Sequence, residues 1–284
     1  MKAVPTIVRY GLEEALRRKT FAVVSVLTIG FLVLYWLGVR ELFQHLDEVI
    51  APDEIIDTRT LVGATVLGLA MFATLFLGAV LAVFLTLGVV RGDAERGLLQ
   101  PLVVRPVGRP TLLFARFLGA ATVCALYVLM VFGIAVAITG LTGDWWPDRL
   151  LTPALELAGA VVVLVGLSLL GSVFLSATAN GIAIFMLFGA GLVAGLLGQI
   201  GEALASDRLE RIATVSSWVL PFEGLYQDGL NELTADTTGF TEFALSLGPF
   251  GGAQEGGAAL RVWAVAYLVL VGAAAVGGFA RRDL

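Results

Sequence analysis

The chain has 284 residues, of which 58% are hydrophobic and only 14% are charged, and its net charge is −5. Soluble domains carry roughly 25% charged residues, so this composition excludes an ordinary water-soluble protein and indicates a chain built for lipid. The single cysteine, Cys124, excludes an intrachain disulfide bond, and with the single histidine, His45, it is too little for a zinc site.

The first elements in chain order are an amphipathic helix over residues 4–16 and a membrane span that follows it. Apolar residues of this first segment recur at helical spacing on one face, and charged residues occupy the other. Such a helix can lie among lipid headgroups or pack against a cytoplasmic partner, and the pattern favours neither. The apolar face consists of Val4, Ile7, Val8, Gly11, Leu12, Ala15 and Leu16.

Long runs without Asp, Glu, Lys or Arg predict six membrane-spanning helices, since a helix crosses a bilayer with about 20 apolar residues. The run over residues 157–201 is too long for one span, and we divide it at the small, turn-prone stretch of residues 176–181. The second span, about 45 Å long as a helix, must tilt or project beyond the hydrocarbon. The predicted spans cover about 20–39, 61–90, 112–143, 154–177, 181–201 and 261–280.

The distribution of cationic residues predicts how the chain sits in the membrane. Twelve of the 18 lysines and arginines fall in the N-terminal segment, around residues 91–116 and at the C-terminus. Cationic residues near span ends mark the cytoplasmic side. We therefore expect both termini and the loop over residues 91–111 in the cytoplasm, and residues 40–60 and 202–260 outside.

The segment over residues 202–260 is the largest predicted loop and contains two local signals. Asp207 and Glu210 are spaced as in an N-terminal capping box. Residues 218–222, which read Trp-Val-Leu-Pro-Phe, are too apolar for a free loop, and we expect them to dip into the membrane interface.

Gly191 and Gly195 in the fifth span form a GxxxG pattern, which lets two membrane helices approach closely. This spacing fits a contact between two copies of the chain. It fits ordinary packing within one copy at least equally well.

Several kinds of chemistry find no support in the sequence. The predicted span interiors carry no charge, which disfavours a channel or a gradient-driven carrier, because these place ionisable residues inside the membrane. A phosphate-binding P-loop needs lysine after glycine, and neither Lys2 nor Lys19 follows glycine. If ATP drives this protein, we expect another subunit to bind it.

The loop between the second and third spans resembles the cytoplasmic loop of type-2 ABC exporter permeases. The resemblance consists of an acidic residue before a Gly-Leu step and then a Pro-Val-Gly-Arg run, where the family typically has Gly-Thr-Leu and Pro-Val-Ser-Arg. The closing stretch from Gly278 to Leu284 is also similar to permeases grouped with copper-enzyme maturation systems. The matching residues of the loop are Glu95, Gly97, Leu98, Pro106, Val107 and Arg109.

This resemblance implies an all-α polytopic permease with six transmembrane helices, an N-terminal amphipathic cytoplasmic helix and a large external segment between helices five and six. It implies a homodimer or heterodimer in the cytoplasmic membrane, with two copies of an ATP-binding subunit that hold ATP and magnesium. No nucleic acid partner is expected. The loop would rest in a groove of the ATPase through Asp93, Glu95, Arg96, Gly97, Arg105, Pro106 and Arg109.

Two other classes remain beside this reading. One is a carrier or channel driven by a gradient, and the other is a membrane scaffold that transports nothing. The arginines of the loop would then serve only to set the orientation of the chain.

Overall fold

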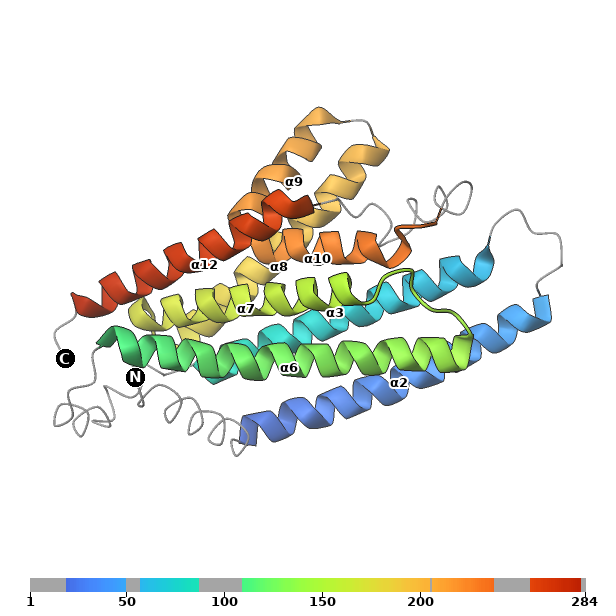
Figure 1. The fold of residues 1–284 in the computed structure, drawn as a ribbon, viewed down its shortest axis with the longest axis horizontal. Helices are drawn as coiled ribbons and strands as arrows, with labels where there is room; N and C mark the ends of the chain where they lie inside the picture. The colour runs from blue at the N-terminus through green and yellow to red at the C-terminus, as the bar shows by residue number, and fades with distance from the viewer. Residues whose placement is uncertain (1–18, 50–56, 87–108, 205, 238–255, 282–284) are drawn as a thin grey trace.

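A computed structural model of the chain describes residues 19–49, 57–86, 109–204, 206–237 and 256–281, and these residues form helices and contain no strand. Long helices lie side by side along the longest dimension of the molecule (Figure 1). Six of the described helices are long and apolar enough to cross a membrane, which confirms the predicted all-α architecture. They are α2 (Lys19–Val49), α3 (Thr58–Thr86), α6 (Arg109–Gly143), α7 (Leu151–Phe174), α8 (Ala177–Ala203) and α12 (Gly257–Ala280).

Helix α7 forms the centre of the bundle, because it contacts α3, α6, α8 and α12. Its side chains are buried on most of its circumference, with Ala160, Val161 and Leu164 fully enclosed. Helix α2 is different, since it buries a single stripe that includes Val24 and Val39 and exposes large apolar side chains elsewhere. In a membrane protein such exposed apolar faces meet lipid.

Pairs of hydroxyl groups join the helices inside the bundle. Thr28 and Tyr127 hydroxyls lie 2.5 Å apart and link α2 to α6, and the Thr86 and Ser168 hydroxyls lie 2.6 Å apart and link α3 to α7. Hydrogen bonds of this kind hold membrane helices together, although each contributes only about 0.6 kcal/mol on average.

Two predicted boundaries need correction. The chain stays helical beyond residue 39, because α2 continues to Val49 and places Phe43 against Gly143, where a Cβ atom would meet the ring. The turn between α7 and α8 falls at residues 175 and 176, so it includes only the first residue of the stretch 176–181 at which we divided the run. Asn180 therefore lies in α8, where its buried amide donates a 2.9 Å hydrogen bond to the Ser168 carbonyl.

The segment between α8 and α12 contains helices that pack on the bundle. Helix α9 (Asp207–Val219) folds back along α8, and α10 (Pro221–Asn231) is followed by the short helix η1 (Glu232–Thr234). The helix start at Asp207 agrees with the predicted signal, but the proposed capping box is wrong, since Ser206 occupies the N-cap and makes no side-chain cap hydrogen bond. Figure 1 shows α10 lying between α12 and α7.

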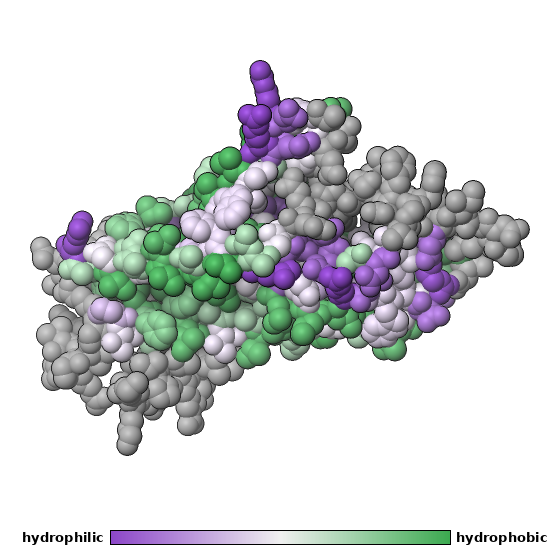
Figure 2. All heavy atoms as spheres, turned by 45° about the horizontal axis from the view of Figure 1, so that its top comes forward, coloured by the Kyte–Doolittle hydropathy of each residue, from purple (hydrophilic) through white to green (hydrophobic). Residues whose placement is uncertain are grey.

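The molecular surface separates apolar from polar regions (Figure 2). Apolar residues cover the middle of the visible face, whereas hydrophilic residues gather at the protruding tip and toward one end. We call this end the α6–α7 end, where α6 stops and α7 begins, and the opposite end, where α7 stops and α8 begins, the α7–α8 end.

Candidate functional site

The residues predicted to couple to an ATPase fall in or beside a part of the chain that the structure does not describe. Residues 93, 95, 96, 97, 105 and 106 lie outside the described ranges. Arg109 is the first residue of α6, at the α7–α8 end of the bundle. The predicted role of this loop therefore stays a prediction.

The most concentrated polar chemistry among the described residues lies at the α6–α7 end, around Arg261 in the first turns of α12. The guanidinium Nε donates a 2.5 Å hydrogen bond to Glu156 Oε1 of α7. Its Nη2 donates a 2.9 Å hydrogen bond to Asp228 Oδ2 of α10. One side chain thus joins three helices, and we call Glu156, Asp228 and Arg261 the Arg261 cluster.

Further contacts connect this cluster to neighbouring segments. Asp228 Oδ1 accepts a 2.8 Å hydrogen bond from the Gly256 amide, directly before α12 begins. Arg261 also lies 3.5 Å from Glu232 of η1, and Glu232 in turn pairs with Arg149 at 2.5 Å, in the connection between α6 and α7. The network therefore fixes the relative positions of five segments at one end of the bundle: α7, α10, η1, α12 and the connection between α6 and α7.

The two carboxylates of the cluster are almost fully enclosed. Glu156 is 5% exposed and Asp228 is 2% exposed, whereas the side chain of Arg261 is 43% exposed. Burial alone would raise the pKa of Asp228. Hydrogen bonds with the Glu156 carboxyl, from the Gly256 amide and from Arg261 outweigh that effect and hold the pKa of Asp228 below its usual value.

Two glycines of α8, Gly191 and Gly195, make room for α10, and we call them the glycine seat. A Cβ atom on Gly191 of α8 would lie 2.7 Å from the ring of Phe222, and one on Gly195 would overlap the Glu223 carboxylate. The Phe222 ring is fully buried and stacks on Phe188 with ring centroids 6.0 Å apart. The close approach that Gly191 and Gly195 permit is therefore an approach of α10 to α8 within one chain.

Of the two interpretations of the GxxxG pattern, this packing agrees with a contact within one copy of the chain. A single chain contains no contact between copies, so the predicted dimer packing of Gly191 and Gly195 is not tested and stays a prediction.

Glu223 is a second buried carboxyl group, on the face of α10 that meets α8. Gln227 Nε2 donates a 2.8 Å hydrogen bond to Glu223 Oε1. Within the described part of the chain, Glu223 Oε2, the Tyr226 hydroxyl and Gln227 Oε1 have no hydrogen-bond partner. Burial raises the pKa of Glu223 to about 7, and the hydrogen bond from Gln227 opposes that rise.

The Arg261 cluster and the packing of α10 on α8 hold several helices in fixed positions relative to one another. The described residues contain no group of three or more His, Cys, Asp or Glu side chains placed to hold a metal ion. An arginine that bridges two enclosed acidic side chains fixes a geometry, because removing the arginine leaves them without their cationic partner. The Arg261 cluster and the glycine seat together hold α10 between α7, α8 and α12.

Sequence reasoning missed both the cluster and the seat. Glu156 and Arg261 stand directly beside charge-free runs, so we read them as the ends of spans, but both lie inside membrane-spanning helices. A signal was present, because an acid in one span and an arginine in another can be paired at the same end of a bundle. Glu223 and Asp228 were assigned to the external segment without a partner.

The residues 218–222, which we expected to dip into the membrane interface, lie in two different environments. Trp218, the second-to-last residue of α9, is half-exposed, and its carbonyl accepts a 2.7 Å hydrogen bond from the Trp263 indole, whereas Phe222 is fully buried. The position of Trp218 at a membrane interface stays a prediction.

Comparison with known proteins identifies the family. The model of the ABC-2 family transporter proteins matches residues 6–284, which is nearly the whole chain. The chain belongs to the ABC-2 family of transporter proteins. This result confirms the family resemblance seen in the loop of residues 91–109.

Two curated relatives carry the same description, "Probable ABC transporter permease protein NosY". The protein of Pseudomonas aeruginosa is 34% identical over 179 residues, which cover 62% of this chain and 58% of that protein. The protein of Stutzerimonas stutzeri is 32% identical over 136 residues, which cover 48% of this chain and 45% of that protein. The chain therefore spans about half the length of the curated relatives it matches.

The buried carboxyl of Glu223 predicts a pH-dependent stability. Its folded pKa of about 7 exceeds the ordinary value of 4.5, so the proton favours the folded state below pH 4.5, and this stabilisation is lost as the pH rises through about 7. From about pH 5 to about pH 8 the free energy of unfolding should fall by about 3 kcal/mol. Thermal unfolding at several pH values measures this dependence. Glu223→Gln should remove the part of the decrease in stability that Glu223 causes, whereas Glu210→Gln in α9 should leave the decrease unchanged. Parallel pH curves for the parent and Glu223→Gln would contradict the assignment.

The glycine seat predicts which substitutions in α8 disturb α10. Gly191→Leu should lower the free energy of unfolding by about 1–3 kcal/mol, because it meets the enclosed Phe222 ring. Gly195→Leu should be milder, since the far ends of Glu223 and Gln227 can move away. The control is Gly189→Leu, because a Cβ atom there meets nothing within 4 Å.

The same three variants also test the predicted dimer contact through native mass spectrometry. Loss of dimer from Gly191→Leu and Gly195→Leu with unchanged unfolding would favour the contact between copies and count against the seat. Loss of stability in a chain that stays equally dimeric would assign both glycines to the seat.

Proposed function

We propose that this chain is the permease subunit of an ABC exporter, which moves its substrate across the cytoplasmic membrane with ATP hydrolysed by a separate subunit. The observation that carries the proposal is the family match over residues 6–284 in a chain with six membrane-spanning helices. The sequence contains no Gly-Lys-Ser/Thr step of a P-loop, which supports a partner as the site of ATP and magnesium. The description of both relatives as ABC transporter permeases supports it further.

The proposed assembly contains two permease chains and two ATP-binding subunits. The permease chains are identical or similar to one another, and both termini of each lie in the cytoplasm together with residues 91–111. Residues 202–260 face outward, so the Arg261 cluster would lie near the outer surface. The closing stretch from Gly278 supports a place among the permeases grouped with copper-enzyme maturation systems, as do the two relatives named NosY.

The loop over residues 91–109 is the proposed contact through which the ATPase drives the permease. Prolines at 101 and 106 restrict the bending of this loop, and arginine offers planar, bidentate pairing to carboxylates on a partner. Helix α6 begins at Arg109, so a force applied to the loop would enter the bundle through a helix that packs along α7.

Two substitutions test the proposed coupling. Glu95→Ala and Arg109→Ala should reduce the amount of ATP-binding subunit that copurifies with the permease, because losing one partner of a partly buried charged contact costs about 2–5 kcal/mol. Arg208→Ala, an exposed residue of α9, is the matched control and should copurify like the parent. Copurification and transport-coupled ATP hydrolysis are measured after membrane insertion has been confirmed.

The outcome also separates the alternatives. A loop whose arginines only set orientation tolerates Glu95→Ala, since this change removes no positive charge. If both variants bind and couple like the parent, the coupling role is wrong. A scaffold or gradient-driven carrier would copurify with no ATP-binding subunit even in its parent form.

A further inference from the structure

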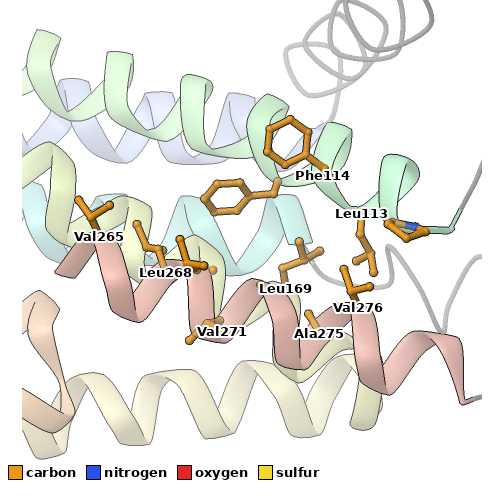
Figure 3. Close-up of a pocket in the computed structure, with 13 residues that line it drawn as sticks. Leu113, Phe114, Leu169, Val265, Leu268, Val271, Ala275 and Val276 are labelled. Atoms are coloured by element: carbon orange, nitrogen blue, oxygen red, sulfur yellow. The ribbon is translucent and has the colours of Figure 1, made fainter. Parts of the chain in front are cut away.

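A groove with a volume of about 370 Å³ lies between α6, α7 and α12, toward the α7–α8 end of the bundle. Figure 3 shows Leu113 of α6 lying opposite Val276 of α12, with Leu169 of α7 beside them, and Phe114 of α6 and Val265 and Leu268 of α12 further along the lining. Every residue of its lining is apolar: Pro110, Leu113, Phe114, Phe117, Gly166, Leu169, Val265, Leu268, Val269, Val271, Gly272, Ala275 and Val276.

The groove opens on the outside of the bundle. Its floor is enclosed, since Leu113 and Leu169 are 4% and 5% exposed, while the rim residues Phe114, Val265 and Val269 are exposed. Gly272 leaves the space open, because a Cβ atom at that position would meet nothing within 4 Å. All three helices are long and apolar enough to cross a membrane, so lipid is available to this opening.

Positive charge lies at one end of the groove. Val276 is near the end of α12, which finishes at Ala280 and is followed by the exposed Arg281. Pro110 is the second residue of α6, directly after Arg109. An apolar groove that ends beside an arginine matches a molecule with an apolar chain and a negative head. Anionic phospholipid has this form, and the cytoplasmic leaflet is rich in it.

The size of the groove argues for a flexible chain as its occupant. A helix with its side chains is about 10–12 Å across, so a helix of another copy could cover the groove but could not enter its 370 Å³. An acyl chain is thin and can follow the floor between Leu113 and Leu169.

We propose that this groove is a binding site for one acyl chain of an anionic phospholipid, whose headgroup lies beside Arg281. The choice of the cytoplasmic leaflet rests on the proposed orientation of the chain. Lipid binding itself is independent of any ATPase, so its test succeeds or fails separately from the proposed coupling. A bound chain would fill the space between α6 and α12 and add packing between these two helices.

Native mass spectrometry of the purified permease tests the proposal with two matched variants on one helix. After delipidation, the parent should bind phosphatidylglycerol in preference to phosphatidylcholine with the same acyl chains. Gly272→Leu places a side chain in the groove and should reduce bound phosphatidylglycerol to below about half of the parent value, because a filled groove offers no further packing surface. Gly277→Leu is the control, since its position also has open space but does not line the groove.

A second pair of variants tests the headgroup. Arg281→Gln should abolish the preference for phosphatidylglycerol over phosphatidylcholine while some lipid still binds. Arg208→Gln, an exposed arginine of α9, should keep the preference.

Photolabelling of the unaltered chain provides a readout that does not depend on the folding of a variant. Phosphatidylglycerol with a photoreactive acyl chain should label peptides containing Phe114 and Val269. The proposal is overturned if label is absent from these peptides, or if Gly272→Leu binds as much lipid as Gly277→Leu. It is also overturned if Gly272→Leu dissociates dimers without changing bound lipid, since a second copy would then be the occupant.

Discussion

The requirement that a charge inside a membrane helix be paired governs the α6–α7 end of this molecule. Arg261 lies in the first turns of α12, and the carboxylates of Glu156 in α7 and Asp228 in α10 both bind its guanidinium. An unpaired ionisable group at the centre of a bilayer costs about 2.5–3.5 kcal/mol or more, and the cost falls toward the ends of a span, where Arg261 lies. The pairing brings α10 between α7 and α12, and it also fixes the start of α12 through the Gly256 amide.

The position of α10 explains why α8 has a glycine at residue 191. Gly191 leaves room for the Phe222 ring, which stacks on Phe188 of α8. The same placement carries Glu223 into an enclosed site that favours its protonated form. Helix α10, which lies between two spans in the sequence, is thus packed into the bundle. Because it contacts both α7 and α12, a movement of α12 relative to α7 must also displace α10.

Charge-free runs predicted the six spans, because the length and apolarity that a bilayer requires are properties of one segment at a time. The end of α2 was harder, since residues 40–49 look like a polar loop until Phe43 is seen against Gly143 of a distant helix. Asn180 looks like a turn residue alone, but its amide binds the Ser168 carbonyl of α7. The cluster depends on residues more than 100 positions apart, such as Glu156 and Arg261, and no local pattern joins them. The coupling loop was found by resemblance and not by geometry.

A double-mutant cycle on Arg261 and Asp228 tests most directly whether their pairing holds α10 in the bundle. Arg261→Gln, Asp228→Asn and the double variant are compared with the parent by their free energies of unfolding in mixed micelles. The account predicts a coupling energy of about 2 kcal/mol, as for a buried pair in one network. The exposed pair of His45 and Glu41, at 3.6 Å in α2, should give at most about 0.5 kcal/mol in the same cycle. A coupling energy near zero for Arg261 and Asp228 would contradict the account.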